Sequence, residues 1–364
     1  MRGPLSGTRV VELGTYVAAP ALGSILGMLG ADVVKVEPPS GDPTRSLTPW
    51  SWVNYNWNKK SIVLDLKSPD GIDRMWRLLK DADVFIESLS PRAVKELGLA
   101  FPKTKRINRK IIYCSIKGFG SDSASSQRVG FDTIAQAEGG LMYVAKSEGG
   151  SPSRVGNPCV DLSAATFGAV GVLSAMLSRP RKAAYIEVPL YDVVVYWNGY
   201  WLPYIDINGS EPTQLGSSHP AFAPYGIFTT KDGFIFIGVL ADPQWQKLVT
   251  KLNLASPTHF SRTGERIAAR EQVNAQVQSA VAQKTTSDLL DLLGEDVPCA
   301  RVSTLMDIYR DEELRKRKVI RTVRHEGRDF SVALPPVPSP RRLRRMPEPP
   351  IFGNGKAGRR GQVD

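Results

Sequence analysis

The chain has 364 residues, more than a single hydrophobic core usually organises, so we expect two lobes that each bury an apolar interior. With 42% hydrophobic and 23% charged residues, it has the composition of a folded globular protein and not of a disordered or fibrous one. Cys114, Cys159 and Cys299 lie far apart and form no CxxC pair, which argues against a disulfide framework or a thiolate zinc site and fits a cytoplasmic protein.

The formal net charge of +11 favours anionic ligands, because a positive field concentrates them near the surface. The densest basic run, residues 340–345, lies in a proline-rich stretch with no nucleic-acid recognition module beside it, so we expect no nucleic acid as partner. A phosphorylated small molecule explains the charge at least as well. No segment reads as a signal peptide or as an uncharged apolar span of about 18 residues, so we expect no membrane contact.

The first residues predict a strand, a turn and a helix, followed at once by a second strand. The strands are expected at 9–13 and 31–37, and small and apolar residues predict a helix at 21–29 between them. Two strands joined in this way lie parallel, with a right-handed crossover. The turn at 14–20 has no GxGxxG pattern, which argues against a dinucleotide cofactor.

The alternation of strands and helices continues through the first half of the chain. Strands are predicted at 61–65, 84–87 and 111–116, and helices at 69–80 and from Ser90 onward. The predicted fold class is therefore α/β, with a Rossmann-like large domain built on an open parallel sheet. Such sheets bind ligands where their strands end in turns, as the last of these strands does at Gly118.

Residues 161–177 are small, apolar and almost uncharged, which predicts a buried helix. Pro158 precedes this helix, so Asp161 should lie in its first turn, at the positive end of the helix dipole. An acid at this place has two interpretations. It either caps free backbone N–H groups, as first-turn aspartates commonly do, or it serves a reaction.

The composition changes after residue 195. Aromatic, Asn and Pro residues predict a connection, and a hairpin is predicted at 226–238, before helices at 243–252 and 266–293. The expected domains are a large domain over 1–195, a connection over 196–224, a smaller α+β domain over 225–310, and a return to the large domain with a basic tail over 311–364.

Several blocks of the sequence resemble, in the same order, those of the class III CoA-transferases, the CaiB/BaiF family. The blocks are residues 30–43, 58–67, 115–120, 130–137, 158–161, the hairpin at 226–238, and 296–302. They span roughly residues 5–335, and many blocks in one order are a stricter demand than one short motif. The resemblance implies an interlocked homodimer that takes an acyl-CoA and a carboxylic acid as substrates and binds no permanent cofactor.

The family's nucleophilic aspartate matches Asp161, which favours the chemical interpretation of this acid. Attack by its carboxylate on a thioester gives a mixed anhydride, which keeps the acyl group activated. Backbone N–H groups at the start of the helix are expected to stabilise the carboxylate and the developing oxyanions.

Coenzyme A carries a diphosphate and a 3′-phosphate, and both need cations. The basic residues in or beside the matching blocks that we expect to bind it are Lys35, Lys59, Lys60, Arg92 and Lys117. Taken singly, each of them is explained about as well as a solvated surface side chain.

The acyl group is expected to meet residues from both halves of the chain. Val17 stands where formyl-CoA-type relatives carry a glutamine, so we expect a more apolar acceptor pocket and no formate or oxalate chemistry. His219 stands where some relatives carry a run of glycines, and it is either an acyl contact or a structural residue. The histidines show no ligand spacing, so no metal site is expected.

The main alternative is an α-methylacyl-CoA racemase of the same fold, which needs an acid and a base on opposite faces of its substrate. Relatives of that type resemble Gly-His-Asp where this chain has Gly130-Phe131-Asp132. Phe131 cannot transfer a proton, so the transferase is favoured, and Asp132 either orients the nucleophile or caps a helix. A non-catalytic acyl-CoA-binding protein is a third hypothesis, against which the presence of Asp161 argues.

Trp50, Trp52, Tyr55 and Trp57 form an aromatic cluster between the second and third predicted strands. We expect this cluster either to pack between the lobes or to line the acyl pocket. Packing is the commoner use of clustered aromatic residues, and an apolar or aromatic acid as substrate fits both interpretations.

Overall fold

The computed structural model describes residues 3–146, 150–213, 216–255, 260–337 and 347–352. The chain forms two compact units: the first holds residues 1–140, 155–197 and 311–364, and the second holds 141–154 and 198–310. The boundaries at 197/198 and 310/311 lie close to those expected from composition. Residues 141–154, expected in the large domain, belong to the second unit instead.

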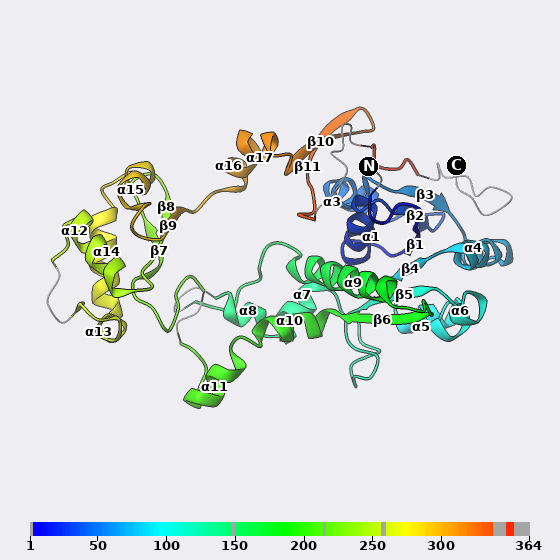
Figure 1. The fold of residues 1–364 in the computed structure, drawn as a ribbon, viewed down its shortest axis with the longest axis horizontal. Helices are drawn as coiled ribbons and strands as arrows, with labels where there is room; N and C mark the ends of the chain where they lie inside the picture. Colours follow the sequence, from blue (N-terminus) through cyan, green and yellow to red (C-terminus); the bar gives the residue numbers. More distant parts are fainter. Residues whose placement is uncertain (1–2, 147–149, 214–215, 256–259, 338–346, 353–364) are drawn as a thin grey trace. The chain divides into compact units, whose positions relative to one another are not determined.

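A parallel sheet of six strands organises the first unit, in the order β3-β2-β1-β4-β5-β6 (Figure 1). The strands are β1 (Arg9–Leu13), β2 (Asp32–Glu37), β3 (Lys60–Val63), β4 (Val84–Glu87), β5 (Ile112–Lys117) and β6 (Ala184–Pro189). The chain builds outward from β1 to β3 and then returns to place β4 on the other side of β1. Such a switch point is where α/β sheets bind ligands, outside the carboxyl ends of the strands. The predicted α/β class with a parallel sheet is confirmed.

Helices connect these strands. They are α1 (Ala18–Met28), α2 (Thr44–Leu47), α3 (Pro49–Asn56), α4 (Pro69–Asp81), α5 (Pro91–Glu96), α6 (Phe101–Ile107), α7 (Asp132–Glu138), α9 (Cys159–Leu177), α10 (Leu190–Asn198) and α17 (Glu312–Lys316). The helix α1 begins earlier than predicted because a proline, Pro20, is tolerated within a first turn.

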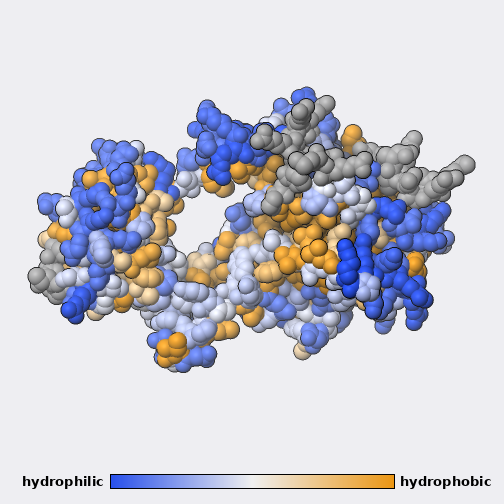
Figure 2. All heavy atoms as spheres, viewed as in Figure 1, coloured by the Kyte–Doolittle hydropathy of each residue, from blue (hydrophilic) through white to orange (hydrophobic). Residues whose placement is uncertain are grey.

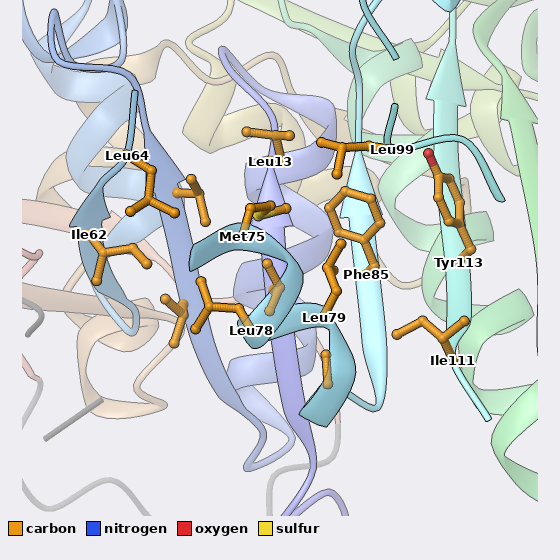
Figure 3. Packing of buried hydrophobic residues seen from close by; sticks show 14 residues of the cluster. Leu13, Ile62, Leu64, Met75, Leu78, Leu79, Phe85, Leu99, Ile111 and Tyr113 are labelled. Atoms are coloured by element: carbon orange, nitrogen blue, oxygen red, sulfur yellow. The ribbon is translucent and has the colours of Figure 1, made fainter. Parts of the chain in front are cut away.

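One face of the sheet is covered by α4, whose apolar residues recur at helical spacing (Figure 3). Met75 and Leu79 of α4 are fully buried and pack in one cluster with Ile62 of β3 and Phe85 of β4. Ser68 caps this helix, since its hydroxyl accepts a hydrogen bond from the Gly71 N–H at 3.0 Å. Local capping and burial thus fix α4 where the sequence predicts it.

The opposite face of the sheet carries α1 and α9, which pack against each other. Small residues allow this close approach, because a Cβ added at Gly168 of α9 would lie 2.9 Å from Leu22 Cδ2 of α1. Side chains alternate along a strand, so Val11 and Leu13 face α4 while Glu12 faces α1. Glu12 is therefore buried beneath α1.

A separate cluster joins α3 to the last hairpin of the first unit. The hairpin consists of β10 (Ile320–His325) and β11 (Arg328–Ala333). Trp52, Trp57, Val323 and Val332 pack together, and the two indoles are each only 1% exposed. These tryptophans are core residues, whereas Trp50 is 66% exposed.

The second unit has its own antiparallel sheet, in the order β7-β8-β9, and its own core. Its strands are β7 (Tyr225–Thr229), β8 (Phe234–Gly238) and β9 (Cys299–Arg301). Its helices are α8 (Leu141–Val144), α11 (Leu202–Asn208), α12 (Asp242–Leu252), α13 (Thr263–Ala268), α14 (Arg270–Val281), α15 (Thr286–Leu293) and α16 (Leu305–Arg310). The predicted hairpin corresponds to β7 and β8, and the region expected as a plain connection contains α11.

The expectation of a buried helix holds for one face of α9 only. Its small residues, such as Ala164, Ala165 and Gly168, are buried, whereas Phe167 and Val170 remain 39% and 60% exposed. Apolar atoms accordingly show on the surface of this unit (Figure 2). Among the described residues, α9 is the one helix long and apolar enough to cross a membrane by length and composition. A helix packed on a sheet passes the same test, and α9 packs on β5 and β6.

Candidate active site

Asp161 lies in the first turn of α9, as predicted from the sequence. The helix leads back to β6 and packs on β5 and β6. A crossover helix of a parallel sheet runs against its strands, so this first turn lies at the carboxyl edge of the sheet. The nucleophile candidate is therefore placed where this fold binds ligands.

The backbone at the start of α9 is capped by Asp132 of α7 and not by Asp161. Asp132 Oδ2 accepts hydrogen bonds from the N–H groups of Val160 at 2.9 Å and Asp161 at 3.2 Å. Its other oxygen accepts one from Gln136 Nε2 at 2.6 Å. These two backbone donors are thus already used, which corrects the expectation that the helix start offers them to an oxyanion. Asp161 therefore does not cap its own helix.

Burial raises the pKa of Asp161 to about 7, and the negative charge of Asp132 adds to the effect. Within the described part of the chain, the Asp161 carboxylate makes no hydrogen bond and no ion pair. The Asp161 side chain is half-buried, and withdrawing a carboxylate from water without a partner costs free energy, which is why such groups concentrate at functional sites. This environment favours the chemical interpretation of Asp161 over the capping one.

Tyr55 of α3 is close enough to Asp161 for the charge of the carboxylate to affect its pKa. Burial raises the pKa of Tyr55 above its usual range, and the charge of Asp161 contributes to the shift. The aromatic cluster of the sequence therefore divides, with Trp52 and Trp57 in the core and Tyr55 beside the candidate nucleophile. The aromatic pattern alone could not distinguish these roles, because the four residues share one short segment.

Phe131 and Val17 both stand immediately before helices. Phe131 precedes Asp132 at the start of α7 and is 52% exposed. Val17 precedes α1 at the carboxyl end of β1, and its side chain caps nothing. The residue before it, Tyr16, has φ +62°, in the left-handed region that bulky residues rarely occupy, and no sequence pattern predicted this conformation.

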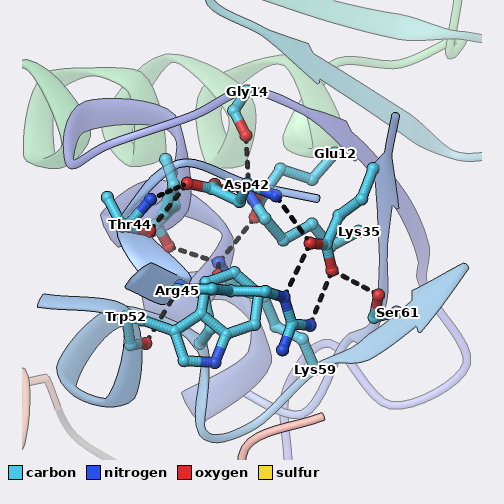
Figure 4. Close-up of polar contacts among 12 residues, drawn as sticks. Glu12, Gly14, Lys35, Asp42, Thr44, Arg45, Trp52, Lys59 and Ser61 are labelled. Atoms are coloured by element: carbon cyan, nitrogen blue, oxygen red, sulfur yellow. Dashed lines mark hydrogen bonds and ion pairs between the residues drawn. The ribbon is translucent and has the colours of Figure 1, made fainter. Parts of the chain in front are cut away.

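Lys35 and Lys59 lie inside the protein, in a cluster of charges beneath α1 (Figure 4). Their side chains have 0% exposure, and both pair with Glu12, at 3.1 Å and 2.7 Å respectively. Lys35 also pairs with Asp42 at 3.0 Å. A phosphate cannot reach an ammonium group that is enclosed in this way, so the expected direct contact with coenzyme A does not fit this geometry.

The three other predicted cations differ in how well they could meet a phosphate. Lys60 is 38% exposed, but its ammonium reaches back toward Asp32, at the amino end of β2, at 3.4 Å. Lys117 ends β5 at the carboxyl edge, where its three donors go to both Glu87 oxygens and to the Leu89 carbonyl. Arg92 follows β4 at the same edge and is 83% exposed. Arg92 is thus the predicted cation that best fits an anion from solvent.

A pocket of about 340 Å³ opens near the carboxyl ends of β4, β5 and β6. Phe101, Tyr113, Phe119 and Tyr185 supply aromatic walls, and Lys117 lines it. The rings of Tyr113 and Tyr185 lie 5.6 Å apart. An apolar or planar group fits such walls, but Tyr113 packs in the cluster of α4, so the pocket lies on the face of the sheet opposite α9 and Asp161.

His219 belongs to the second unit and lies in an aromatic group with Tyr200, Trp201 and Phe222. Its Nδ1 accepts a hydrogen bond from the Ala221 N–H at 3.1 Å, and its Nε2 lies 3.3 Å from the Tyr200 hydroxyl. Burial and the charge of Arg270 lower the pKa of His219. These contacts explain His219 within its own unit. In the described ranges, no group of three or more His, Cys, Asp or Glu side chains could hold a metal ion.

The first unit is thus an α/β domain with a parallel sheet, a switch point and, in the described structure, an acid without a hydrogen-bond partner at the carboxyl edge. The model of CoA-transferase family III matches residues 5–355, and the chain belongs to this family. It is therefore a CoA-transferase. The match covers both units.

Named relatives are similar over most of their length. The succinyl-CoA:mesaconate CoA-transferase of Haloarcula hispanica is 31% identical over 91% of this chain and 88% of its own. The succinyl-CoA:glutarate CoA-transferase of Mus musculus is 31% identical over 88% of this chain and 77% of its own. Among solved structures, a CaiB/BaiF family protein from Brucella suis has a TM-score of 0.87 at 29% identity, covering 97% of each chain.

Proposed function

We propose that this protein moves coenzyme A from an acyl-CoA to a carboxylic acid, with Asp161 as the nucleophile. The observation that carries the proposal is a half-buried carboxylate at the carboxyl edge of the sheet that neither caps its helix nor pairs with a cation in the described structure. A carboxylate in this state is weakly solvated, so little hydration water has to be removed from it before it attacks a carbonyl carbon.

The proposed reaction passes through four balanced steps. The Asp161 carboxylate attacks the thioester carbonyl, which breaks the C–S bond and gives an acyl-aspartyl anhydride and CoA thiolate. The thiolate attacks the Asp161 carbonyl, releases the first acid as its carboxylate and leaves an aspartyl-CoA thioester. The acceptor carboxylate attacks this thioester and forms a second anhydride and thiolate. The thiolate then attacks the acceptor carbonyl, which frees the new acyl-CoA and restores Asp161.

The substrates we propose are an acyl-CoA of a short dicarboxylic acid, such as succinyl-CoA, and a second short acid. Support comes from the relatives, whose names give succinyl-CoA as donor and mesaconate, glutarate or L-malate as acceptor. Coenzyme A is then a substrate and not a resident cofactor. We place the reaction in the cytoplasm, away from membranes and nucleic acids, because the free cysteines and the soluble-protein composition suit that compartment.

The experiment replaces Asp161 by Ala and follows transfer of CoA from succinyl-CoA to mesaconate, glutarate and L-malate by mass detection of new thioesters. The variant should keep the fold and bind succinyl-CoA but lose exchange. In the wild type, hydroxylamine added with succinyl-CoA should leave a hydroxamate on Asp161. Undiminished turnover by Asp161→Ala, or an adduct on another residue, would reject this nucleophile.

A second assay separates transfer from racemisation, which would exchange the α-proton of the substrate. Phe131 occupies the place where a proton-transferring histidine would be required, and its ring holds no acid or base. In deuterated water, a 2-methylacyl-CoA should therefore gain no deuterium beyond the background rate. Enzyme-dependent labelling without an adduct on Asp161 would favour the racemase instead.

A further inference from the structure

Lys35 and Lys59, which both pair with Glu12, donate hydrogen bonds to the two ends of one turn (Figure 4). The connection at residues 14–17 joins β1 to α1, and together with the first helical residues up to Pro20 it is called here the β1–α1 turn. Lys35 Nζ donates a hydrogen bond to the Gly14 carbonyl at 2.5 Å, and Lys59 Nζ donates one to the Pro20 carbonyl at 2.7 Å. Because Glu12 pairs with both lysines, it connects the two ammonium groups that hold the turn.

The cluster is built into the packing and is not a surface accident. A Cβ added at Gly23 of α1 would lie 2.0 Å from Glu12 Oε2, so the helix leaves room for this carboxylate only because Gly23 has no side chain. Lys59 is further held by Asn56 Oδ1 at 2.9 Å. Burying such charges rarely gains stability over apolar residues, so the cluster is better explained by the backbone conformation that it fixes.

The held turn contains a residue in an unfavourable backbone conformation. Tyr16 has φ +62°, a left-handed conformation that is unfavourable for a residue with a bulky side chain. Such a conformation persists where the surroundings fix it, and here both ends of the turn are anchored to buried ammonium groups. The conformation turns the Tyr16 side chain outward, where it is 54% exposed.

The turn lies at the same edge of the sheet as the nucleophile. Helices α1 and α9 touch at Leu22 and Gly168, and both begin at the carboxyl edge of the sheet. Ala18, the first residue of α1, precedes Leu22 by four residues, or about 6 Å along the helix, and Asp161 precedes Gly168 by seven residues, or about 10 Å; Tyr16 lies two residues before Ala18. Tyr16 and Asp161 thus stand at neighbouring helix starts of the same edge.

We propose that Glu12, Lys35 and Lys59 are positioning residues that hold the β1–α1 turn so that Tyr16 contacts the acyl group at Asp161 and sets which acid is accepted. The inference rests on the proposed function, since it assigns part of the acyl pocket of that reaction. Lys35 and Lys59, expected from the sequence to bind phosphate, thereby act through the turn and not on coenzyme A.

Two variants test the two halves of the inference. Tyr16→Gly removes the ring but keeps the turn, because glycine adopts a positive φ without strain. The double variant Glu12→Gln/Lys59→Met removes one charge of each sign, so the cluster stays balanced while the Pro20 carbonyl loses its donor. The matched control is Asp83→Asn/Arg181→Met, which removes a half-buried ion pair of 3.1 Å beside the amino end of β4.

The measured quantity is the ratio of kcat/KM for mesaconate and for butyrate, with succinyl-CoA as donor. Both test variants should change this ratio at least about tenfold, whereas the control should keep it even if its melting temperature falls equally. An unchanged ratio in Tyr16→Gly would overturn the role of Tyr16. An unchanged ratio in a folded double variant would overturn the role of the cluster.

Failure of this inference differs visibly from failure of the proposed function. If the wild type exchanges no CoA, the transferase proposal itself fails. If the wild type exchanges CoA but the variants keep its acceptor ratio, only the present inference fails. Should the double variant not fold, Tyr16→Gly together with the smaller change Lys59→Gln still decides between the outcomes, since each alters one contact of the turn.

Discussion

Asp161 is a first-turn acid that does no capping, because Asp132 from another helix satisfies the N–H groups of Val160 and Asp161. Two carboxylates thus lie at the start of α9, and only Asp132 caps the helix. Asp132 is stabilised by three hydrogen bonds, while Asp161 is held without any in the described structure. A pair of acids in such different surroundings is typical of a site where only one of them reacts.

At this scale, the raised pKa of Asp161 predicts a characteristic pH dependence of stability. Between about pH 4 and about pH 7 the native side chain keeps a proton that the unfolded chain has released, so unfolding becomes easier as the pH rises through this window. Asp161→Asn should remove this loss and be more stable than the wild type above pH 7, by on the order of 1–4 kcal/mol. Denaturant unfolding at pH 4.5 and 8 measures it.

The matched control for that experiment is Asp288→Asn, which changes an exposed first-turn acid of α15. The difference between Asp161→Asn and the wild type should shrink as the pH falls toward 4, because both then carry a neutral side chain. A gain that is equal at both pH values would show that the substitution acts through packing and not through the charge of Asp161.

Arg92 is the predicted cation that we expect to meet a phosphate of coenzyme A. It is exposed at the carboxyl edge, and its i,i+4 partner Glu96 is also exposed. Arg92→Ala should raise KM for succinyl-CoA several-fold and weaken the salt dependence of KM, with little change in kcat. The control Arg324→Ala removes an exposed, paired arginine from β10 and should leave KM unchanged. Equal effects of the two variants would refute a phosphate contact at Arg92.

At the scale of elements, the Asp132 side chain of α7 caps the start of α9. Asp132→Ala should weaken the start of α9 and lower stability by about 1–2 kcal/mol, whereas Asp132→Asn keeps an acceptor oxygen for the cap. Both variants remove a negative charge beside Asp161, so the rising limb of the pH profile of kcat/KM should move to lower pH in both.

The comparison that isolates this effect is Thr285→Ala, which removes the cap of α15, where the Thr285 hydroxyl accepts from the Asp288 N–H at 3.2 Å. That variant should lose similar stability without moving the pH profile. If the Asp132→Asn profile matches that of the wild type, Asp132 acts on α9 only through its hydrogen bonds.

Elements with their own local signals were predictable from the sequence. The strand at 84–87 and the helix that begins at Pro69 have their expected bounds at these ends, because β-branched runs and a Ser-Pro cap determine them locally. The hairpin of β10 and β11 was missed, although Gly327 at φ +77° marks its turn. It lies in a basic stretch whose composition suggested a tail.

The site was predictable at Asp161 and much less so around it. The first-turn position follows from the pattern of α9, but the cap by Asp132 spans 29 residues and has no local signature. The same holds for Lys59, whose partner Glu12 lies on a strand two places away in the sheet. Long-range pairing of buried charges depends on sheet order, which a single sequence does not reveal residue by residue.

At the scale of the whole molecule, we propose a homodimer. Helices α9 and α10 expose large apolar side chains, among them Val170, Leu177 and Tyr196 at 60%, 77% and 71% exposure. Apolar surface of this kind usually marks an interface. Light scattering at micromolar concentration should give twice the chain mass of 39.9 kDa. Val170→Lys should shift the mass toward that of one chain, whereas a monomeric wild type would contradict the proposal.

The first unit is assembled from three separate stretches of chain, and its last stretch supplies β10 and β11. The indoles of Trp52 and Trp57 pack against Val323 and Val332, which belong to this last stretch. During synthesis at about 5–20 residues per second, these rings therefore emerge from the ribosome roughly 15–50 s before the hairpin that covers them. For that interval the nascent chain carries an uncovered tryptophan surface. A chaperone that holds hydrophobic segments would have its natural binding site at α3.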